Sequence, residues 1–374
     1  MSSNIRNQLA TIRKSRGVAA ADLARRVGVS RQTIYAIEAG TYVPNTDVTL
    51  RLARELEVAV EAIFSLASEP RADAEPVATR LLSSRTSVKG QPARLCQVGE
   101  QWVSIPVSPA PYYLPEADGV ISHVRKPGGG SADVVRFAGD AVAHKRLVIA
   151  GCDPASTVLA GMVEKIAGVE IVPAAASSAL ALSWLEQGAV HIAGSHLEDP
   201  GTGEFNLPYL RREFPNGDFA VITFARWEEG FVTAPGNPKA ISRTEHLAAR
   251  NVRFVNREKG SGSRALLDRL LREADMPDAR VSGYQDEAYG HLAAAYRLVS
   301  GEADCCIATR SAARAFGLDF VPLKSERYDL VMWRQTLQLP IVQAFLDVLQ
   351  HAGFRRKLEA LAGYDTAQTG SVLA

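Results

Sequence analysis

Residues 252–270 read VRFVNREKGSGSRALLDRL, and this stretch passes from a strand pattern through a Gly/Ser loop into a helix pattern. β-branched and aromatic residues favour a buried strand over 252–256, and apolar residues at helical spacing follow residue 263. The same alternation of strands and helices runs from residue 146 to the end. We therefore predict parallel sheets covered by helices, in two α/β lobes with ligands bound between them at the carboxyl ends of strands.

The loop in this stretch has the residues of an anion-binding site. Its glycines let the backbone approach a ligand, and its serines offer hydroxyl and N–H donors where the helix begins. Two arginines add planar cationic groups that suit oxyanions. The pattern GxxxxGK[ST] is absent, so nucleotide hydrolysis is not indicated. The predicted ligand-binding residues here are Arg257, Gly260, Ser261, Gly262, Ser263 and Arg264.

Other strand-end loops supply further candidates for the same cleft, although capping a helix is the alternative role for Asp153, Ser177 and Ser178. The candidates are Cys152, Asp153, Ser177, Ser178, Ser195, His196, Tyr289 and Thr309. His191 lies within a predicted strand and is interpreted as a core histidine. We predict no metal site, because His191, His196 and Asp199 do not converge at this spacing.

These loops resemble the substrate-binding domains of the type 2 periplasmic-binding-protein superfamily. More narrowly, they resemble the molybdate-binding-type domain fused to helix-turn-helix regulators. The matching tracts are GCDPA (151–155), HIAGSHLED (191–199), NREKGSGSRALLD (256–268), GHLAAAYRLVSGEADCCIA (290–308) and YDLVMW (328–333). The chain departs from the family at Tyr289-Gly290 and at Cys305-Cys306. The resemblance implies a small oxyanion ligand, and the departures allow a different one.

Residues 5–64 have an all-helical pattern of a different kind. A short helix ending at Gly28 and a second one capped by Ser30 form a helix-turn-helix, with Leu23, Val27, Ile34 and Ile37 as its shared core. The second helix would enter the major groove of DNA. The predicted DNA-binding residues are Ser30, Arg31, Gln32, Thr33, Tyr35 and Asn45.

The tract GVSRQTIYAIEAGTYVP (28–44) resembles the Xre/Cro-type helix-turn-helix domain of phage repressors and bacterial regulators. This resemblance implies an internal ion pair between Arg13 and Glu38, and a phosphate contact at Asn45. Ala19-Ala20-Ala21 stands where the family often has Ser-Gln. We therefore expect base preference to depend more on the second helix of the motif.

The bulk properties fit a regulator with a separate sensing domain. Residues 1–64 carry a net charge of +3 and the remainder −2, which favours a nucleic-acid reader joined to another function. We predict a helix-turn-helix domain at 1–66, a linker at 67–93 and a ligand-sensing domain at 94–374. Its first lobe comprises about 94–222 and 320–374, and its second about 223–319. No signal peptide or membrane span is predicted, so we expect a cytoplasmic protein with reduced cysteines.

The sequence thus predicts a DNA-binding transcription regulator rather than an enzyme, without a cofactor. We expect a homodimer on double-stranded operator DNA, because specific affinity usually comes from two half-sites. The predicted effector is a small anion such as molybdate or tungstate. An organic anion (sulfonate, phosphate ester or carboxylate) and a redox response of Cys152, Cys305 or Cys306 remain alternatives.

Overall fold

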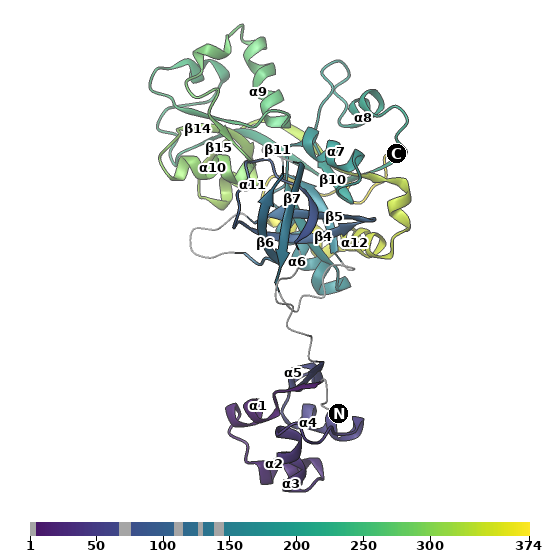
Figure 1. Cartoon of the computed structure of the whole chain (residues 1–374). Coiled ribbons are helices and arrows are strands. Elements are labelled where there is room, and N and C mark those ends of the chain that lie inside the picture. Colours follow the sequence, from purple (N-terminus) through teal and green to yellow (C-terminus); the bar gives the residue numbers. More distant parts are fainter. Residues whose placement is uncertain (1–4, 67–75, 108–114, 126–129, 138–145) are drawn as a thin grey trace. The chain divides into compact units, whose positions relative to one another are not determined.

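The computed structural model describes residues 5–66, 76–107, 115–125, 130–137 and 146–374 (Figure 1). The chain divides into an N-terminal unit, Met1–Ala74, and a C-terminal unit, Glu75–Ala374. Each unit has hydrophobic cores of its own. No helix in these described ranges has the length and apolar character needed to cross a membrane.

The N-terminal unit is a small helical bundle closed by a two-stranded sheet. Its elements are β1 (Ile5–Asn7), α1 (Leu9–Ser15), α2 (Ala20–Val27), α3 (Arg31–Glu38), α4 (Thr46–Glu55), α5 (Val60–Ile63) and β2 (Phe64–Leu66). The predicted shared core of α2 and α3 is confirmed, since Leu23, Val27, Ile34 and Ile37 are all buried together. The predicted all-helical pattern of residues 5–64 is wrong at its two ends, because residues 5–7 pair with 64–66 as strands.

A closed five-stranded barrel occupies the start of the C-terminal unit. Its strands are β3 (Val77–Leu81), β4 (Pro92–Val98), β5 (Gln101–Pro106), β6 (Gly119–Val124) and β7 (Gly130–Arg136). The predicted linker at 67–93 is therefore wrong over residues 77–93, while 67–75 lie outside the described residues. Thr79 and Leu81 alternate inward along β3, a period-2 pattern that the surrounding Ser, Arg and Pro obscure.

The rest of the C-terminal unit is built on one nine-stranded sheet with the order β13-β12-β14-β11-β15-β10-β8-β9 and β16 beside β11. Its strands are β8 (Arg146–Gly151), β9 (Glu170–Ala175), β10 (Ile192–Ser195), β11 (Phe219–Thr233), β12 (Phe254–Arg257), β13 (Glu287–Ala288), β14 (Cys305–Thr309), β15 (Asp319–Trp333) and β16 (Tyr364–Asp365). The predicted α/β fold class is confirmed, but the predicted parallel sheets are a single mixed sheet, because β11 pairs antiparallel with both β14 and β15. β11 and β15 are each one continuous strand of 15 residues.

Helices cover both faces of this sheet (Figure 1). They are α6 (Ser156–Ala167), α7 (Ser178–Glu186), α8 (Leu207–Glu213), α9 (Gly262–Glu273), α10 (His291–Val299), α11 (Arg310–Ala315), α12 (Pro340–Gln350) and α13 (Ala352–Ala360), with short 3₁₀ turns at Thr244–Ala248, Asp278–Arg280 and Arg334–Gln338. Successive residues of β8 enter different cores, Leu147 in one and Val148 in the other. Cys305 and Cys306 of β14 do the same in the second lobe, so each lobe has a core on either side of the sheet.

The two lobes share β11 and β15, which cross from one to the other. Along β11, Trp227 belongs to a core of the first lobe and Phe231 to a core of the second. Along β15, Leu323 packs against the core of the second lobe and Tyr328 belongs to the core of the first. The residues between these points, including Glu229 and Glu326, lie at the junction of the lobes.

A buried ionic network fastens the barrel to the first lobe. Arg146 of β8 donates to Asp118 from two nitrogens, at 2.8 and 3.0 Å, and to the carbonyl of Leu95 in β4 at 2.8 Å. Arg94 of β4 donates to Asp118 at 3.0 Å and also contacts Glu170 of β9. Burial alone would raise the pKa of the Asp118 carboxyl, but the hydrogen bonds and charges of the arginines lower it overall.

Candidate ligand site and nucleic-acid interface

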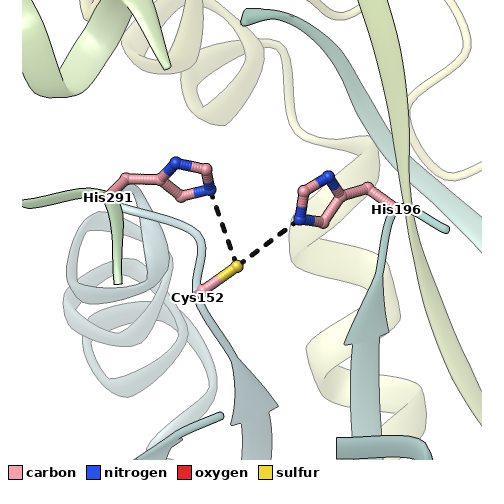
Figure 2. Close-up of side chains that lie close together, drawn as sticks. All are labelled: Cys152, His196 and His291. Carbon is pink, nitrogen blue, oxygen red and sulfur yellow. Dashed lines mark hydrogen bonds between the residues drawn. The ribbon is translucent and has the colours of Figure 1, made fainter. Parts of the chain in front are cut away.

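A cysteine and two histidines meet where strands of the first lobe face the second lobe (Figure 2). Cys152 directly follows β8, His196 directly follows β10, and His291 is the first residue of α10. The Sγ of Cys152 lies 3.7 Å from Nε2 of His196 and 3.6 Å from Nε2 of His291. Both imidazoles are 1% exposed, so the three side chains face one another inside the protein.

Two buried carboxyl groups from the shared strands complete this group. Glu326 of β15 is hydrogen-bonded to Nδ1 of His196 at 2.7 Å. Oε1 of Glu229, from β11, lies 3.7 Å from His196 Nδ1 and from His291 Nε2. Cys152, His196, His291, Glu229 and Glu326 are called the His196 cluster below.

Burial determines the protonation of the cluster. It raises the pKa of Glu229 to about 8, with repulsion from Glu326 as the second cause, and raises that of Glu326 to about 8. Burial also holds the pKa of His291 well below its usual range, assisted by the charge of Arg257. For His196, burial lowers the pKa, but the hydrogen bond to Cys152 and the charges of Cys152 and Glu229 raise it overall.

The loop of residues 257–263 borders this cluster. Arg257 is fully buried and forms a bidentate ion pair with Glu258, at 2.9 and 3.0 Å. Its remaining Nη1 contacts Ser263 Oγ at 3.5 Å, and Ser263 in turn donates to Glu229 at 3.1 Å. The charge of Arg257 is therefore already compensated within the protein, and the serine connects the loop to the cluster.

Gly262 lets this loop approach His196. A Cβ on Gly262 would lie 2.5 Å from two atoms of the His196 ring and 3.0 Å from its carbonyl oxygen. A side chain at this position would displace the imidazole, because packed interiors leave no room for such overlap. The glycine is thus required by the position of His196.

Several predicted ligand-binding residues instead hold local structure. Ser177, Ser261 and Thr309 are the N-caps of α7, α9 and α11 and accept bonds from backbone N–H groups. Ser178 accepts from the N–H of His196 at 3.2 Å and so fixes the cluster indirectly. Gly260, at φ +82°, accepts from the N–H of Ala179 through its carbonyl.

The remaining predicted residues of the first lobe are buried beside Cys152 and His196. Asp153 accepts from Ala155 N–H at 2.6 Å and from the Tyr364 hydroxyl at 2.7 Å, and burial raises its pKa to about 6. Ser195 is fully buried at the end of β10, and its hydroxyl has no partner among the described residues. Asp153 is not the N-cap of α6, because that helix begins after Ala155.

Arg264 and Tyr289 face other partners. The Arg264 guanidinium lies 4.1 Å from the Tyr284 ring centroid and forms ion pairs with Asp268 at 3.4 Å and Glu287 at 3.6 Å. Tyr289 stacks under Arg85, at 5.0 Å from its ring centroid. Helix α9 thus carries the Arg264 side chain toward Tyr284, and its role as a ligand-binding residue stays a prediction.

Sequence reasoning missed most of the cluster. Glu229, Glu326, Glu258 and His291 were not among the predicted ligand-binding residues. Glu229 directly follows Glu228, and Glu326 lies in the polar tract KSERYD (324–329), so neither acid stands out in the sequence. The interpretation of His191 as a core histidine is confirmed: it is 8% exposed and its Nδ1 accepts from Val148 N–H at 3.0 Å.

The four cysteines are all free. Cys96, Cys305 and Cys306 are fully buried, and burial raises the pKa of Cys96 and Cys306 to about 12 and that of Cys305 well above its usual range. Cys152 is the only cysteine of the chain that is partly exposed. Reactive thiol chemistry is therefore confined to Cys152.

In the N-terminal unit, α3 presents its polar side to solvent. Ser30 caps the helix by accepting from Thr33 N–H at 3.0 Å, and Arg31, Gln32 and Tyr35 are exposed while Ile34 and Ile37 are buried. The Arg31 guanidinium donates to the Tyr35 hydroxyl at 2.8 Å. The polar residues predicted to touch DNA thus lie along one exposed side of a short helix.

The ion pair expected between Arg13 and Glu38 is confirmed, with nitrogen–oxygen distances of 2.6 and 3.1 Å. The hydrogen bond to Glu38 raises the pKa of Arg13. Asn45 is exposed and caps α4 by accepting from Val48 N–H at 2.9 Å. The pair ties α1 to α3 and thereby sets the position of the exposed helix.

Comparison with known proteins matches both units. Residues 5–63 match the model of a helix-turn-helix domain, and residues 160–350 match that of the PBP superfamily domain. YvgK of Bacillus subtilis, an uncharacterized protein, is 37% identical over 187 residues, which cover 50% of this chain and 60% of YvgK. The chain thus spans less than two thirds of the length of this relative.

Two further similarities concern one unit each. The uncharacterized HTH-type transcriptional regulator MJ0272 of Methanocaldococcus jannaschii is 40% identical over 60 residues, 16% of this chain and 91% of that protein. A putative phosphate ABC transporter substrate-binding protein from Clostridium perfringens superposes with a TM-score of 0.45 at 13% identity, over 59% of this chain and 99% of that one. Since the superfamily match covers half of the sequence, the chain belongs to the PBP superfamily, with a helix-turn-helix domain in its N-terminal unit.

Proposed function

We propose that this protein is a DNA-binding transcription regulator of the Xre type whose C-terminal unit binds a small effector between its lobes. The observation that carries the proposal is the exposed polar side of α3, joined in one chain to a PBP-superfamily domain. Arg31 and Gln32 have the donor and acceptor groups that read guanine and adenine in the major groove. Binding as a homodimer would supply the two half-sites that specific affinity usually requires.

The proposed effector is a small anion, with molybdate and tungstate as the first candidates. Two helices of more than eight residues, α7 and α9, begin beside His196, and N–H groups at helix N-termini favour anions. Ser263 adds a hydroxyl at the same place. Organic anions of similar charge fit the same donors and are the second candidates.

Selection of bound sequences from random DNA with the purified full chain tests the DNA-binding part. We expect an enriched motif, and loss of about 1–3 kcal/mol of specific binding in Gln32→Ala and Arg31→Ala. Lys357→Ala is the control, since it removes one exposed positive charge from the C-terminal unit. Binding without any enriched motif, with equal affinity in all variants, would refute the proposal.

A thermal-shift series tests the effector. Molybdate, tungstate, sulfate and phosphate are compared at equal concentration, because a ligand that binds the folded state raises Tm. We expect stabilisation by at least one of these anions and its loss in Ser263→Ala. If no anion raises Tm above that of the anion-free protein, the anion proposal is refuted. The proposal of DNA binding is not affected by that result.

A further inference from the structure

We propose that Cys152, His196 and His291 bind a divalent transition-metal ion of the zinc class, and that the effector anion takes the open position of that ion. The metal site stands on geometry alone, while its link to the anion rests on the proposed function. The site lies where both lobes contribute ligands: Cys152 and His196 come from the first and His291 from the second.

The sulfur–nitrogen distances match those around a tetrahedral zinc ion, and all three ligand atoms lie within 4.8 Å of one another. Zinc–sulfur bonds of about 2.3 Å and zinc–nitrogen bonds of about 2.0 Å place neighbouring ligand atoms about 3.5 Å apart. The observed distances from Cys152 Sγ to the two Nε2 atoms are 3.6 and 3.7 Å. Figure 2 shows the sulfur between the two rings, with one nitrogen of each ring turned toward it.

Hydrogen bonds can hold the three side chains together only in one way. A thiol carries one proton, so Cys152 donates to one Nε2 atom and accepts from the other, whose ring carries its proton there. A cation between Sγ and the two Nε2 atoms would replace both of these contacts at once.

His196 is already oriented as metal-binding histidines usually are. Its Nδ1 is hydrogen-bonded to Glu326 at 2.7 Å and its Nε2 points at Cys152, so a metal bound at Nε2 would leave the ring proton on Nδ1, facing Glu326. Such a carboxylate partner fixes the tautomer and the ring orientation of a ligating histidine. Ser178 holds the backbone N–H of the same residue at 3.2 Å, so ring and backbone are both fixed.

The metal would supply the positive charge that the loop arginines do not. Arg257 is paired with Glu258, and Arg264 with Asp268 and Glu287. A thiolate and two imidazoles select zinc, cobalt or copper over magnesium and calcium. Three protein ligands leave one tetrahedral position for an exogenous ligand, and the neighbouring N-termini of α7 and α9 favour an anion there.

Cobalt substitution tests the site directly. The full chain is reduced, freed of metal by a chelator and titrated with CoCl₂. We expect the visible bands of tetrahedral cobalt and a thiolate-to-cobalt charge-transfer band, both saturating at equimolar metal. Cys152→Ser should remove the charge-transfer band, and His291→Ala should weaken binding about 10-fold or more. His351→Ala, which removes an exposed histidine elsewhere, should change neither.

Alkylation of the wild-type chain gives a readout that needs no variant. Because Cys152 is the only partly exposed cysteine, iodoacetamide should label it first. We expect saturating ZnCl₂ to slow this labelling at least tenfold. Rapid labelling that zinc does not slow, together with no cobalt bands, would overturn the proposal and would indicate a nucleophilic Cys152–His196 pair instead.

DNA binding and anion binding are measured in parallel to separate the two proposals. Tungstate added to the cobalt-loaded chain should shift the visible bands, and should stabilise the metal-free chain less than the loaded one. Cobalt bands that tungstate leaves unchanged would refute the open position for the anion. A chain that binds cobalt but selects no DNA would refute the regulator, and a chain that selects DNA without binding cobalt would refute the metal site.

Discussion

At the residue scale, His196 organises the candidate site. Its backbone N–H donates to Ser178, its Nδ1 contacts Glu326 and its Nε2 contacts Cys152. Gly262 lies against its ring. Trp227 and Tyr328 surround the imidazole at ring-centroid distances of 5.0 and 6.0 Å. Every side of this histidine is therefore occupied, and small changes around it should alter ligand binding.

Gly262→Ala should disturb the cluster without removing any polar group. The added methyl overlaps the His196 ring, so we expect about 1–3 kcal/mol of lost stability and weaker ligand binding. Chemical denaturation and the cobalt titration measure the two effects. Gly161→Ala, at an open position in α6, is the control and should stabilise the protein by about 0.5–1 kcal/mol. Similar behaviour of the two variants would contradict the close approach at Gly262.

His191 should contribute a distinct dependence of stability on pH. Burial lowers its folded pKa to about 4 from the usual 6.5. Because the unfolded chain then binds the extra proton, stability is lost as pH falls from about 6.5 toward 4, by up to about 3 kcal/mol. His191→Gln lacks this titration. The difference in unfolding free energy between wild type and variant should fall over this window, and a constant difference would contradict a neutral buried His191.

At the element scale, the sequence predicted long and regular elements correctly and missed short and irregular ones. The βα units from residue 146 were found because long apolar periodicity outweighs local exceptions. The barrel at 77–136 was missed: residues 77–93 were predicted as a linker and 94–136 as part of the first lobe, because short strands interrupted by Ser, Arg and Gly have little pattern of their own. Glu229 and Glu326 of the His196 cluster were missed for a related reason. They come together only because β11 and β15 pair across the lobes. Pairing of strands that are distant in the sequence leaves no local signal.

Asp118→Asn should loosen the attachment of the barrel to the first lobe. The carboxylate is 2% exposed and bonds to both Arg94 and Arg146, so its loss leaves Glu170 as the acid that these two partly buried cations share. We expect about 1.5–3 kcal/mol of lost stability by chemical denaturation, the usual range for a hydrogen bond to a charged group. Asp133→Asn, which breaks an ion pair with the more exposed Arg125 in the same barrel, should cost at most about 1 kcal/mol. Equal losses would contradict a fastening role for Asp118.

At the scale of the whole molecule, regulation requires that the two units influence each other. An effector can change DNA affinity only if it binds one state of the protein more tightly than another. The His196 cluster suits this role, because its ligands come from both lobes and its geometry depends on how the lobes meet. Couplings of about 1–3 kcal/mol are typical of such proteins, which corresponds to about 5–150-fold in affinity.

The most direct test is the affinity of the full chain for its selected DNA, measured by fluorescence anisotropy at fixed ionic strength. Metal-free protein is compared with protein saturated with zinc and tungstate, and Cys152→Ser is measured in the same way. We predict that the two ligands together change Kd at least fivefold for the wild type and leave Cys152→Ser unchanged. An identical Kd with and without bound ligands in the wild type would contradict a regulator controlled through this cluster.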